Sequence, residues 1–367
     1  MPRILVESDH FLKILPVILD PRTTPEHRNA VADFFAHDVP DFLSWCESYR
    51  PKIANLYPSE IEFAADQAEF EAKLEGAEIA VVESFQVRRE ALERAKRLLI
   101  VQKFGAILSN IDVSACKERR VSVVSIARSV NAIVAEHAFA LMIALSKRIC
   151  ELAGKVTAED LGRIGYPVTP YDRRYIGGSN YARIPHLKTL YGATLGIVGL
   201  GEVGAELAKR ANAFQMSVVY YQRNRLPTHD EMTLGARYTA LNELMAASDY
   251  IVVQLPLNDS TRGIIGSAEL RAAKRGAILV NTARAHLVDR EALLEALDSG
   301  RLAGAGFDVG YSEPAEPYEP LLKYKSGNVI LMPHTAIGDR RHGLEDYEIM
   351  LRNLSRALDL RTRGRYV

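Results

Sequence analysis

Three short stretches of the sequence carry side chains suited to acid–base chemistry and anion binding. Arg284 lies in "VNTARAHLVDREAL", Asp308 and Glu313 lie in "LAGAGFDVGYSEP", and His334 lies in "NVILMPHTAIG". Each stretch begins with an apolar, β-rich run, and ligands of open α/β sheets bind outside the carboxyl ends of the strands. We therefore expect these side chains to converge at one edge of a sheet.

The residue types fit the reduction of a carbonyl group next to a carboxylate, which needs a hydride donor, a proton donor and a fixed cation. His334 would give a proton to the carbonyl oxygen. Glu313, bonded to the other ring nitrogen, would fix the tautomer and favour the imidazolium. Arg284 would bind the substrate carboxylate and stabilise the developing negative charge.

Each of these residues also has an ordinary structural explanation. A single histidine after a strand is commonly a capped or surface residue, a glutamate before proline commonly ends a loop, and an arginine at a strand end commonly forms an ion pair. Only their joint placement behind a site for a hydride donor favours the chemical interpretation.

The segment "GLGEVG", residues 199–204, is the candidate site for that donor. In a dinucleotide-binding turn, Gly199 would make the bend, Gly201 would let the backbone approach the pyrophosphate, and Gly204 would let the helix pack on the strand. The helix amides that begin at Glu202 and Val203 would face the phosphates. A glycine-rich turn without a ligand is the alternative, but an apolar strand, a helix and a second strand ending about twenty residues later supply the required context.

The end of that second strand, "VVYYQRNR", bears on which dinucleotide binds. A site for NAD usually places Asp or Glu here to accept hydrogen bonds from the ribose 2′-hydroxyl. This chain has Tyr221 and Gln222, followed by Arg223, Asn224 and Arg225. Because no carboxylate would repel a 2′-phosphate and arginine binds phosphate well, we predict NADP(H), with NAD(H) as the second choice. A solvated basic turn is the structural alternative.

The elements that would position these residues form two alternating series. The bursts "LPVIL", "IEFAA", "EIAVV", "RLLIVQ" and "VSVVSI" alternate with helical segments, which predicts an α/β domain with a parallel sheet. From Thr194 onward six further bursts predict a complete doubly wound, Rossmann-type sheet. A long amphipathic segment at about 132–152 separates the series, and residues 344–364 read as a terminal helix.

Composition narrows the class of protein. The length of 367 residues suits two domains, and 46 basic residues balance 46 acidic ones, so nothing favours nucleic acid. Cys46, Cys116 and Cys150 are too far apart for a disulfide framework or a metal site. No signal-peptide pattern is present, and the run "AFALMIALS" is too short to cross a bilayer. We expect a cytoplasmic protein with no metal, nucleic-acid or membrane partner.

The order of the motifs resembles that of the D-isomer-specific 2-hydroxyacid dehydrogenase family. GLGEVG is followed by NTAR with LVD, by GAGFDV with Glu and Pro, and by NV with PH. The resemblance covers about residues 95–345, including "KFGAILSNIDV" and "SVNAIVAEHAFALMIAL". It implies that Arg284, Glu313 and His334 are the catalytic set and that the substrate is a small 2-keto or 2-hydroxy acid.

The resemblance also implies contacts beyond the glycine turn. Asp308 would contact the nicotinamide carboxamide, and backbone amides in a loop would bind the substrate carboxylate. The additional cofactor positions are Val134, Leu255, Pro256, Thr261, Thr282 and Ala283. The loop residues are Gly105, Ala106 and Ile107.

The resemblance further implies a discontinuous, flavodoxin-like substrate domain, residues 1–129 and 337–367. The dinucleotide-binding domain would be residues 130–336, with the substrate in a cleft between the two and with homodimers formed through the cofactor domain and the interdomain helix.

Some positions depart from the family pattern. Ile107 and Ala285 stand where glycine is usual, and Gln254 stands where many members have histidine. Because a β-branched residue resists positive φ, Ile107 leaves the shape of the carboxylate loop open. Segments 20–60 and 165–190 are longer than is typical. A dinucleotide-sensing corepressor and a dehydrogenase of another oxyanion such as phosphite remain alternatives, whereas Glu313 argues against the formate-oxidising branch, which has Gln.

Overall fold

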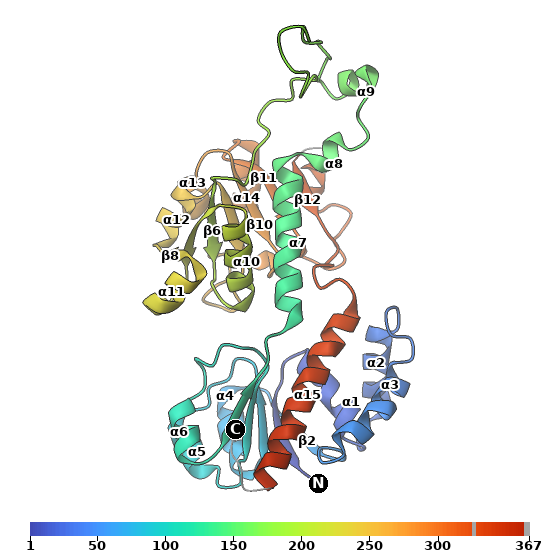
Figure 1. Cartoon of the computed structure of the whole chain (residues 1–367), viewed down its shortest axis with the longest axis vertical. Coiled ribbons are helices and arrows are strands. Elements are labelled where there is room, and N and C mark those ends of the chain that lie inside the picture. Colours follow the sequence, from blue (N-terminus) through green and yellow to red (C-terminus); the bar gives the residue numbers. More distant parts are fainter. Residues whose placement is uncertain (325–327, 363–367) are drawn as a thin grey trace. The chain divides into compact units, whose positions relative to one another are not determined.

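Two parallel β-sheets form the framework of the protein (Figure 1). The structure is a computed structural model that describes residues 1–324 and 328–362. Unit 1 comprises residues 1–130 together with the described residues from 337 onward, and unit 2 comprises the described part of 131–336. The predicted α/β class is confirmed for both sheets.

The sheet of unit 1 has the strand order β2-β1-β3-β4-β5, which is the flavodoxin-like order. Its central strands are buried on both faces, which explains their continuous apolar runs. The strands are β1 (Arg3–Glu7), β2 (Glu60–Ala64), β3 (Ile79–Val82), β4 (Ile100–Lys103) and β5 (Ser122–Ser125).

Helices cover this sheet, and the long segment 20–60 supplies part of them. Trp45 and Tyr49 of α3 bond Glu348 of α15, at 3.1 Å from the indole Nε1 to Oε1 and 3.0 Å from the hydroxyl to the backbone oxygen. The segment therefore shares one apolar core with the terminal helix. The helices are α1 (Leu15–Leu19), α2 (Pro25–Phe35), α3 (Phe42–Tyr49), α4 (Gln67–Lys73), α5 (Arg89–Arg94), α6 (Val113–Glu118) and α15 (Arg340–Thr362), with short 3₁₀ turns at Leu12–Ile14, Arg50–Ile53 and Leu74–Gly76.

The first strand is not where the sequence pattern placed it. The run "LPVIL" was expected to be a strand but forms helix α1, and the first strand is β1, with the sequence RILVE. All five residues of α1 are buried, so the run shows no alternation that would distinguish a strand from a buried helix. Pro16 also suits the first turn of a helix.

The sheet of unit 2 has the order β12-β11-β10-β9-β6-β7-β8. This is the Rossmann order extended by one strand, with the order reversing between β6 and β9. The six predicted bursts are all strands, and β8 is an additional one. The strands are β6 (Thr194–Val198), β7 (Ser217–Tyr221), β8 (Ala236–Tyr238), β9 (Tyr250–Val253), β10 (Ala277–Asn281), β11 (Leu302–Phe307) and β12 (Val329–Leu331).

The helices and turns of unit 2 connect these strands. They are α7 (Ser129–Ser146), α8 (Ile149–Leu152), α9 (Ala158–Arg163), α10 (Glu202–Ala213), α11 (Thr228–Leu234), α12 (Leu241–Ala247), α13 (Ser267–Ala272), α14 (Arg290–Asp298) and the 3₁₀ turns Ala285–Leu287 and Pro320–Tyr324.

The segment expected to be one amphipathic helix differs in two respects. It breaks near Arg148, whose φ is +53°, into α7 and α8. Helix α7 also carries apolar residues on all its sides and is long and apolar enough, by length and composition, to cross a membrane. Its residues Ala138, Met142 and Leu145 nevertheless pack into the core of unit 2, as the core helix of a globular unit does.

Residues 165–190, which we call the arm, have no helix or strand. Figure 1 draws the arm as irregular chain that forms a loop after α9 and then returns to β6. Arg183 lies over the ring of Tyr171 at 4.6 Å, and Tyr181 donates to the backbone oxygen of Val156 at 3.1 Å. Tyr175 and Ile176 are 81% and 62% exposed, so the arm leaves large apolar side chains uncovered.

Candidate active site

The glycine turn has the shape that a dinucleotide requires. Gly199 follows β6 with φ +104°, and a Cβ at this position would lie 2.5 Å from the backbone oxygen of Gln254. A Cβ on Gly204 would lie 2.5 Å from the backbone oxygen of Gly199, whereas a Cβ on Gly201 would meet open space. The turn therefore has no room for a side chain at Gly199 or Gly204, whereas the space at Gly201 is open. A pyrophosphate approaches this second glycine in dinucleotide sites of this type.

Helix α10 begins directly at Glu202 with no side-chain cap, so its first amides and the positive end of its dipole face the turn. The Glu202 carboxylate accepts a hydrogen bond from Asn131 of α7 at 2.5 Å. Glu202 thus ties α7 to α10, a role that the sequence pattern did not indicate.

The polar side chains after β7 differ in the partners that they bond within the chain. Gln222 Oε1 accepts the Leu200 amide at 3.2 Å, and its Nε2 donates to the backbone oxygen of Asn224 at 2.7 Å. Arg225 pairs with both oxygens of Glu231, at 2.9 and 2.7 Å. Arg225 and the Tyr220 hydroxyl lower the pKa of Glu231 to about 2. Arg225 is therefore committed to a structural pair, and Arg223 remains an exposed cation at the strand end.

The loop after β9 lies against the glycine turn. A Cβ on Gly199 would lie 2.9 Å from Leu255 Cδ2. Thr261 closes the loop, because its hydroxyl donates to the backbone oxygen of Pro256 at 2.7 Å and accepts the Asn258 amide at 2.9 Å. Leu255, Pro256 and Thr261 therefore form one wall next to Gly199.

Thr282 and Ala283 continue from the end of β10. The Thr282 hydroxyl accepts a hydrogen bond from Gln254 Nε2, so the glutamine at the usual histidine position links β9 to β10. The Ala283 amide donates to Asn281 Oδ1 at 3.0 Å, and Asn281 Nδ2 donates to the backbone oxygen of Arg284 at 2.9 Å. Asn281 was not predicted, and it fixes the backbone that carries Arg284. Val134, on α7, is half-buried.

His334 and Glu313 are in direct contact. His334 Nδ1 lies 2.9 Å from Glu313 Oε2, and Glu313 Oε1 accepts the Gly310 amide at 3.0 Å. Partial burial opposes ionisation of Glu313, but His334, the Gly310 amide and the charge of Arg284 outweigh it and hold the pKa below its usual value. The glutamate is therefore ionised at neutral pH and orients the ring.

Arg284 follows β10 and is exposed, with Nη1 donating to the backbone oxygen of Ala283 at 2.7 Å. Strand β11 lies between β10 and β12 in the sheet. Arg284, Glu313 and His334 therefore follow three adjacent strands, at the edge where parallel strands present their carboxyl ends.

Asp308 directly follows β11 and bonds the loop that carries His334. It is fully buried, its Oδ1 accepts the Thr335 amide and its Oδ2 accepts the Ala336 amide, both at 2.8 Å. Both oxygens are thus engaged by the loop that carries His334. His137 Nε2 lies 3.3 Å from Oδ1. The sequence pattern gave no role to His137.

The loop of Gly105, Ala106 and Ile107 follows β4 and belongs to unit 1. The Ile126 amide donates to the backbone oxygen of Gly105 at 3.1 Å. Ile107 is 40% exposed, and its φ is not among the positive values found for non-glycine residues in the described chain. The loop therefore adopts a shape that a β-branched residue accepts.

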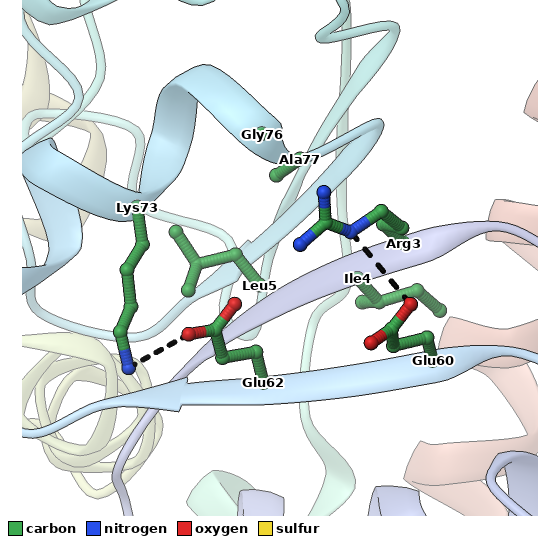
Figure 2. Close-up of a pocket in the computed structure, with 8 residues that line it drawn as sticks. All are labelled: Arg3, Ile4, Leu5, Glu60, Glu62, Lys73, Gly76 and Ala77. Carbon is green, nitrogen blue, oxygen red and sulfur yellow. Dashed lines mark ion pairs between the residues drawn. The ribbon is translucent and has the colours of Figure 1, made fainter.

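A small hollow elsewhere in unit 1 lacks the properties of a ligand site. Figure 2 shows its ion pairs, with Arg3 3.7 Å from Glu60 and Lys73 3.0 Å from Glu62. Its volume is about 10 Å³, the least that holds one water molecule. Within residues 1–324 and 328–362, no group of three His, Cys, Asp or Glu side chains is arranged to hold a metal ion.

Comparison with known proteins agrees with the geometry. The sequence model of the D-isomer specific 2-hydroxyacid dehydrogenase NAD binding domain matches residues 139–336, more than half of the chain. The chain belongs to this family. The resemblance inferred from the motifs is confirmed.

Relatives named glyoxylate reductase extend the match to both units. Those of Korarchaeum cryptofilum and Thermococcus litoralis are each 36% identical to this dehydrogenase. The matches cover 72% and 73% of this chain, and 74% and 76% of theirs. A solved glyoxylate reductase from Paecilomyes thermophila is 26% identical with a TM-score of 0.56, over 100% of this chain and 97% of that one.

This dehydrogenase is an NAD(P)-dependent oxidoreductase that transfers a hydride between a nicotinamide dinucleotide and a 2-keto or 2-hydroxy acid. The glycine turn described above fits the dinucleotide, because Gly201 leaves room beside the uncapped start of α10.

Proposed function

We propose that the enzyme reduces a small 2-keto acid, of the size of glyoxylate or hydroxypyruvate, to the D-2-hydroxy acid with His334 as the proton donor. The observation that carries this proposal is the 2.9 Å contact between His334 Nδ1 and Glu313, beside Arg284 at the carboxyl ends of adjacent strands. The names of the two glyoxylate reductases support a small substrate.

The proposed reaction needs a hydride at the carbonyl carbon and a proton at its oxygen. The bound, reduced dinucleotide supplies the hydride and is oxidised. Because Nδ1 faces Glu313, Nε2 of His334 is the nitrogen that gives up the proton. Glu313 stabilises the imidazolium before the transfer, and Arg284 binds the carboxylate and polarises the carbonyl.

We propose that residues 130–336 act as the dinucleotide-binding domain and that residues 1–129 with 337–367 act as the substrate domain. The amides of Gly105, Ala106 and Ile107 would bind the substrate carboxylate. Replacing Ile107 with Gly tests this assignment, because a changed loop alters KM for the keto acid while leaving dinucleotide affinity unchanged. An unchanged KM would argue against it.

A panel of keto acids tests the reaction itself. NADPH consumption is followed with glyoxylate, hydroxypyruvate, pyruvate and bulkier 2-keto acids, and the chirality of the product is determined. We expect turnover with the smallest substrates and a D-product. If folded, dinucleotide-loaded protein turned over none of them, the proposed substrate class would be wrong.

We propose that the enzyme prefers NADP(H) over NAD(H). The support is the absence of a carboxylate after β7 and the exposed Arg223 next to Gln222. Arg225 pairs with Glu231, so Arg223 is the arginine next to Gln222 that would contact a 2′-phosphate.

We propose that the enzyme is a homodimer in which a second copy covers one face of α7 and the arm. Ile133, Ala140 and Ala144 share that face at helical spacing and are not buried, with Glu136 as the charged residue among them. Tyr175 and Ile176 of the arm are also uncovered, and large apolar side chains left exposed in this way would be covered by a second copy.

We also propose that the enzyme works in the cytoplasm without a nucleic-acid or membrane partner. The equal numbers of acidic and basic residues and the packing of α7 into the core of unit 2 support this location. Fractionation of cells is the measurement, and recovery of the enzyme with the membrane fraction would contradict it.

A further inference from the structure

The backbone at His334 is held in a conformation that a side chain disfavours. Its φ is +57°, in the left-handed region where the Cβ of an L-residue is crowded. Such a residue persists only where the surrounding structure holds it. The contact with Glu313 orients the ring of His334 but does not bond its backbone.

Asp308 provides the backbone restraint. Its two oxygens accept the amides of Thr335 and Ala336, the two residues that follow His334, and the Thr335 hydroxyl lies 3.4 Å from Oδ1. A carboxylate that accepts two adjacent amides fixes the direction of the chain at that point. The carboxylate is 0% exposed, so its charge must be balanced inside unit 2.

His137 is the polar side chain of α7 that contacts this carboxylate. Its side chain is 19% exposed, and its Nε2 lies 3.3 Å from Asp308 Oδ1. His137 Nε2 is buried and has no other hydrogen-bond partner in the described chain, so Asp308 Oδ1 is the polar atom that lies beside it. Burial opposes ionisation of Asp308, but His137 and the amides of Thr335 and Ala336 outweigh it and lower the pKa of Asp308.

We propose that His137 is a positioning residue for the reaction: by pairing with Asp308 it holds the backbone that aims His334. The inference rests on the proposed role of His334 as the proton donor. It gives Asp308 a task other than contact with the nicotinamide carboxamide, because both carboxylate oxygens bond the loop that carries His334.

Replacement of His137 by Phe and by Gln tests the proposal. Phenylalanine fills the space but removes the polar contact of residue 137 with Asp308, and we expect kcat to fall on the order of 10-fold to 100-fold because the acid is displaced. KM for the keto acid and Kd for the dinucleotide should change less than about twofold, because Arg284 and the glycine turn are untouched. Glutamine can still direct an N–H at Asp308 and should restore most of kcat.

Hydrogen exchange provides a readout that needs no substrate. We expect the amides of Thr335 and Ala336 to exchange faster in His137→Phe than in the wild type and near the wild-type rate in His137→Gln. His229→Gln is the matched control, since His229 is an exposed histidine of α11 in the same unit, and it should change neither kcat nor exchange. If His137→Phe does not fold, His137→Asn replaces it, since the shorter amide cannot reach Asp308.

Two results would overturn the proposal: unchanged exchange at Thr335 and Ala336 in the Phe or Asn variant, or an equal loss of kcat in the Phe and Gln variants. Failure of the proposed function gives a different pattern. In that case His334→Ala retains full activity, while His137→Phe still accelerates exchange at the two amides.

Discussion

The contact between Glu313 Oε2 and His334 Nδ1 leaves Nε2 as the ring nitrogen that would give the proton in the proposed reaction. At this scale, a carboxylate that is ionised at neutral pH keeps the imidazole in one orientation. Asn281 restrains its neighbours in the same way, because its side-chain amide accepts from the Ala283 amide and donates to the backbone oxygen of Arg284.

Replacing His334 with Ala should lower kcat on the order of 10²–10⁴-fold, because the developing alkoxide loses its proton donor. Affinity for the dinucleotide should be retained, since the glycine turn is unchanged. Steady-state kinetics and a separate binding titration measure the two effects. Full activity of this variant would mean that another group is the acid.

The lowered pKa of Glu313 predicts the direction of an acid limb. A carboxyl group with a depressed folded-state pKa contributes its interaction above its ordinary value of 4.5 and loses it as pH falls through the folded value. We therefore expect kcat to be independent of Glu313 ionisation above pH 4.5 and to fall below it. The limb should disappear from the pH profile of Glu313→Gln and persist in Glu316→Gln, whose side chain is exposed.

Gln222→Asp should shift the ratio of kcat/KM from NADPH toward NADH, because a carboxylate repels a 2′-phosphate and accepts bonds from a 2′-hydroxyl. Side-by-side kinetics with the two dinucleotides measure the ratio, with Arg225→Gln as the control for a cation already paired with Glu231. An unchanged ratio would place the 2′-binding groups elsewhere.

At the scale of elements, the turn between β6 and α10 separates packing from ligand binding. A Cβ on Gly204 would lie within 2.5 Å of the Gly199 backbone oxygen, whereas Gly201 faces open space. Gly204 therefore lets the helix pack on the strand, and Gly201 leaves space for a ligand.

We predict that Gly204→Ala lowers the free energy of unfolding without dinucleotide by about 1–3 kcal/mol, the usual cost of overpacking. Gly201→Ala should leave that free energy within about 0.5 kcal/mol of the wild type and still weaken dinucleotide binding. Urea unfolding and a binding titration on both variants give the comparison. Equal effects of the two substitutions on stability would contradict the assignment.

At the scale of the whole molecule, α7 and the arm leave apolar side chains exposed, with Tyr175 and Ile176 the most exposed of the arm. Helix α7 is apolar on all sides, but only part of it faces the core of unit 2. A helix of this composition commonly lies inside an assembly.

Light scattering should therefore give a mass of twice 40.8 kDa for the wild type. The substitutions Tyr175→Glu and Ile176→Glu should each favour the monomer, because burying an unpaired charge at an interface is unfavourable. Neither should change the circular dichroism spectrum. Tyr318→Glu, an equally exposed tyrosine outside α7 and the arm, should leave the mass unchanged. A monomeric wild type would contradict the proposed dimer.

Local sequence was sufficient to predict a strand or a turn where its pattern extends over the whole element. The six bursts after Thr194 indicated six strands, and the glycine spacing indicated the turn, because close approach of backbones leaves no room for a side chain. It failed at "LPVIL", where a run buried on every side shows no periodicity, and this run is the helix α1.

The sequence determined by itself that this chain has a dinucleotide turn followed by Arg284, Glu313 and His334 at successive strand ends. Tertiary structure alone decided which groups these residues contact: Arg225 pairs with Glu231, and Asp308 bonds the loop after His334 with His137 beside it. The reason is physical. Residues 137 and 308 are brought within 3.3 Å only by the packing of α7 near β11, and no local preference of either residue encodes that distance.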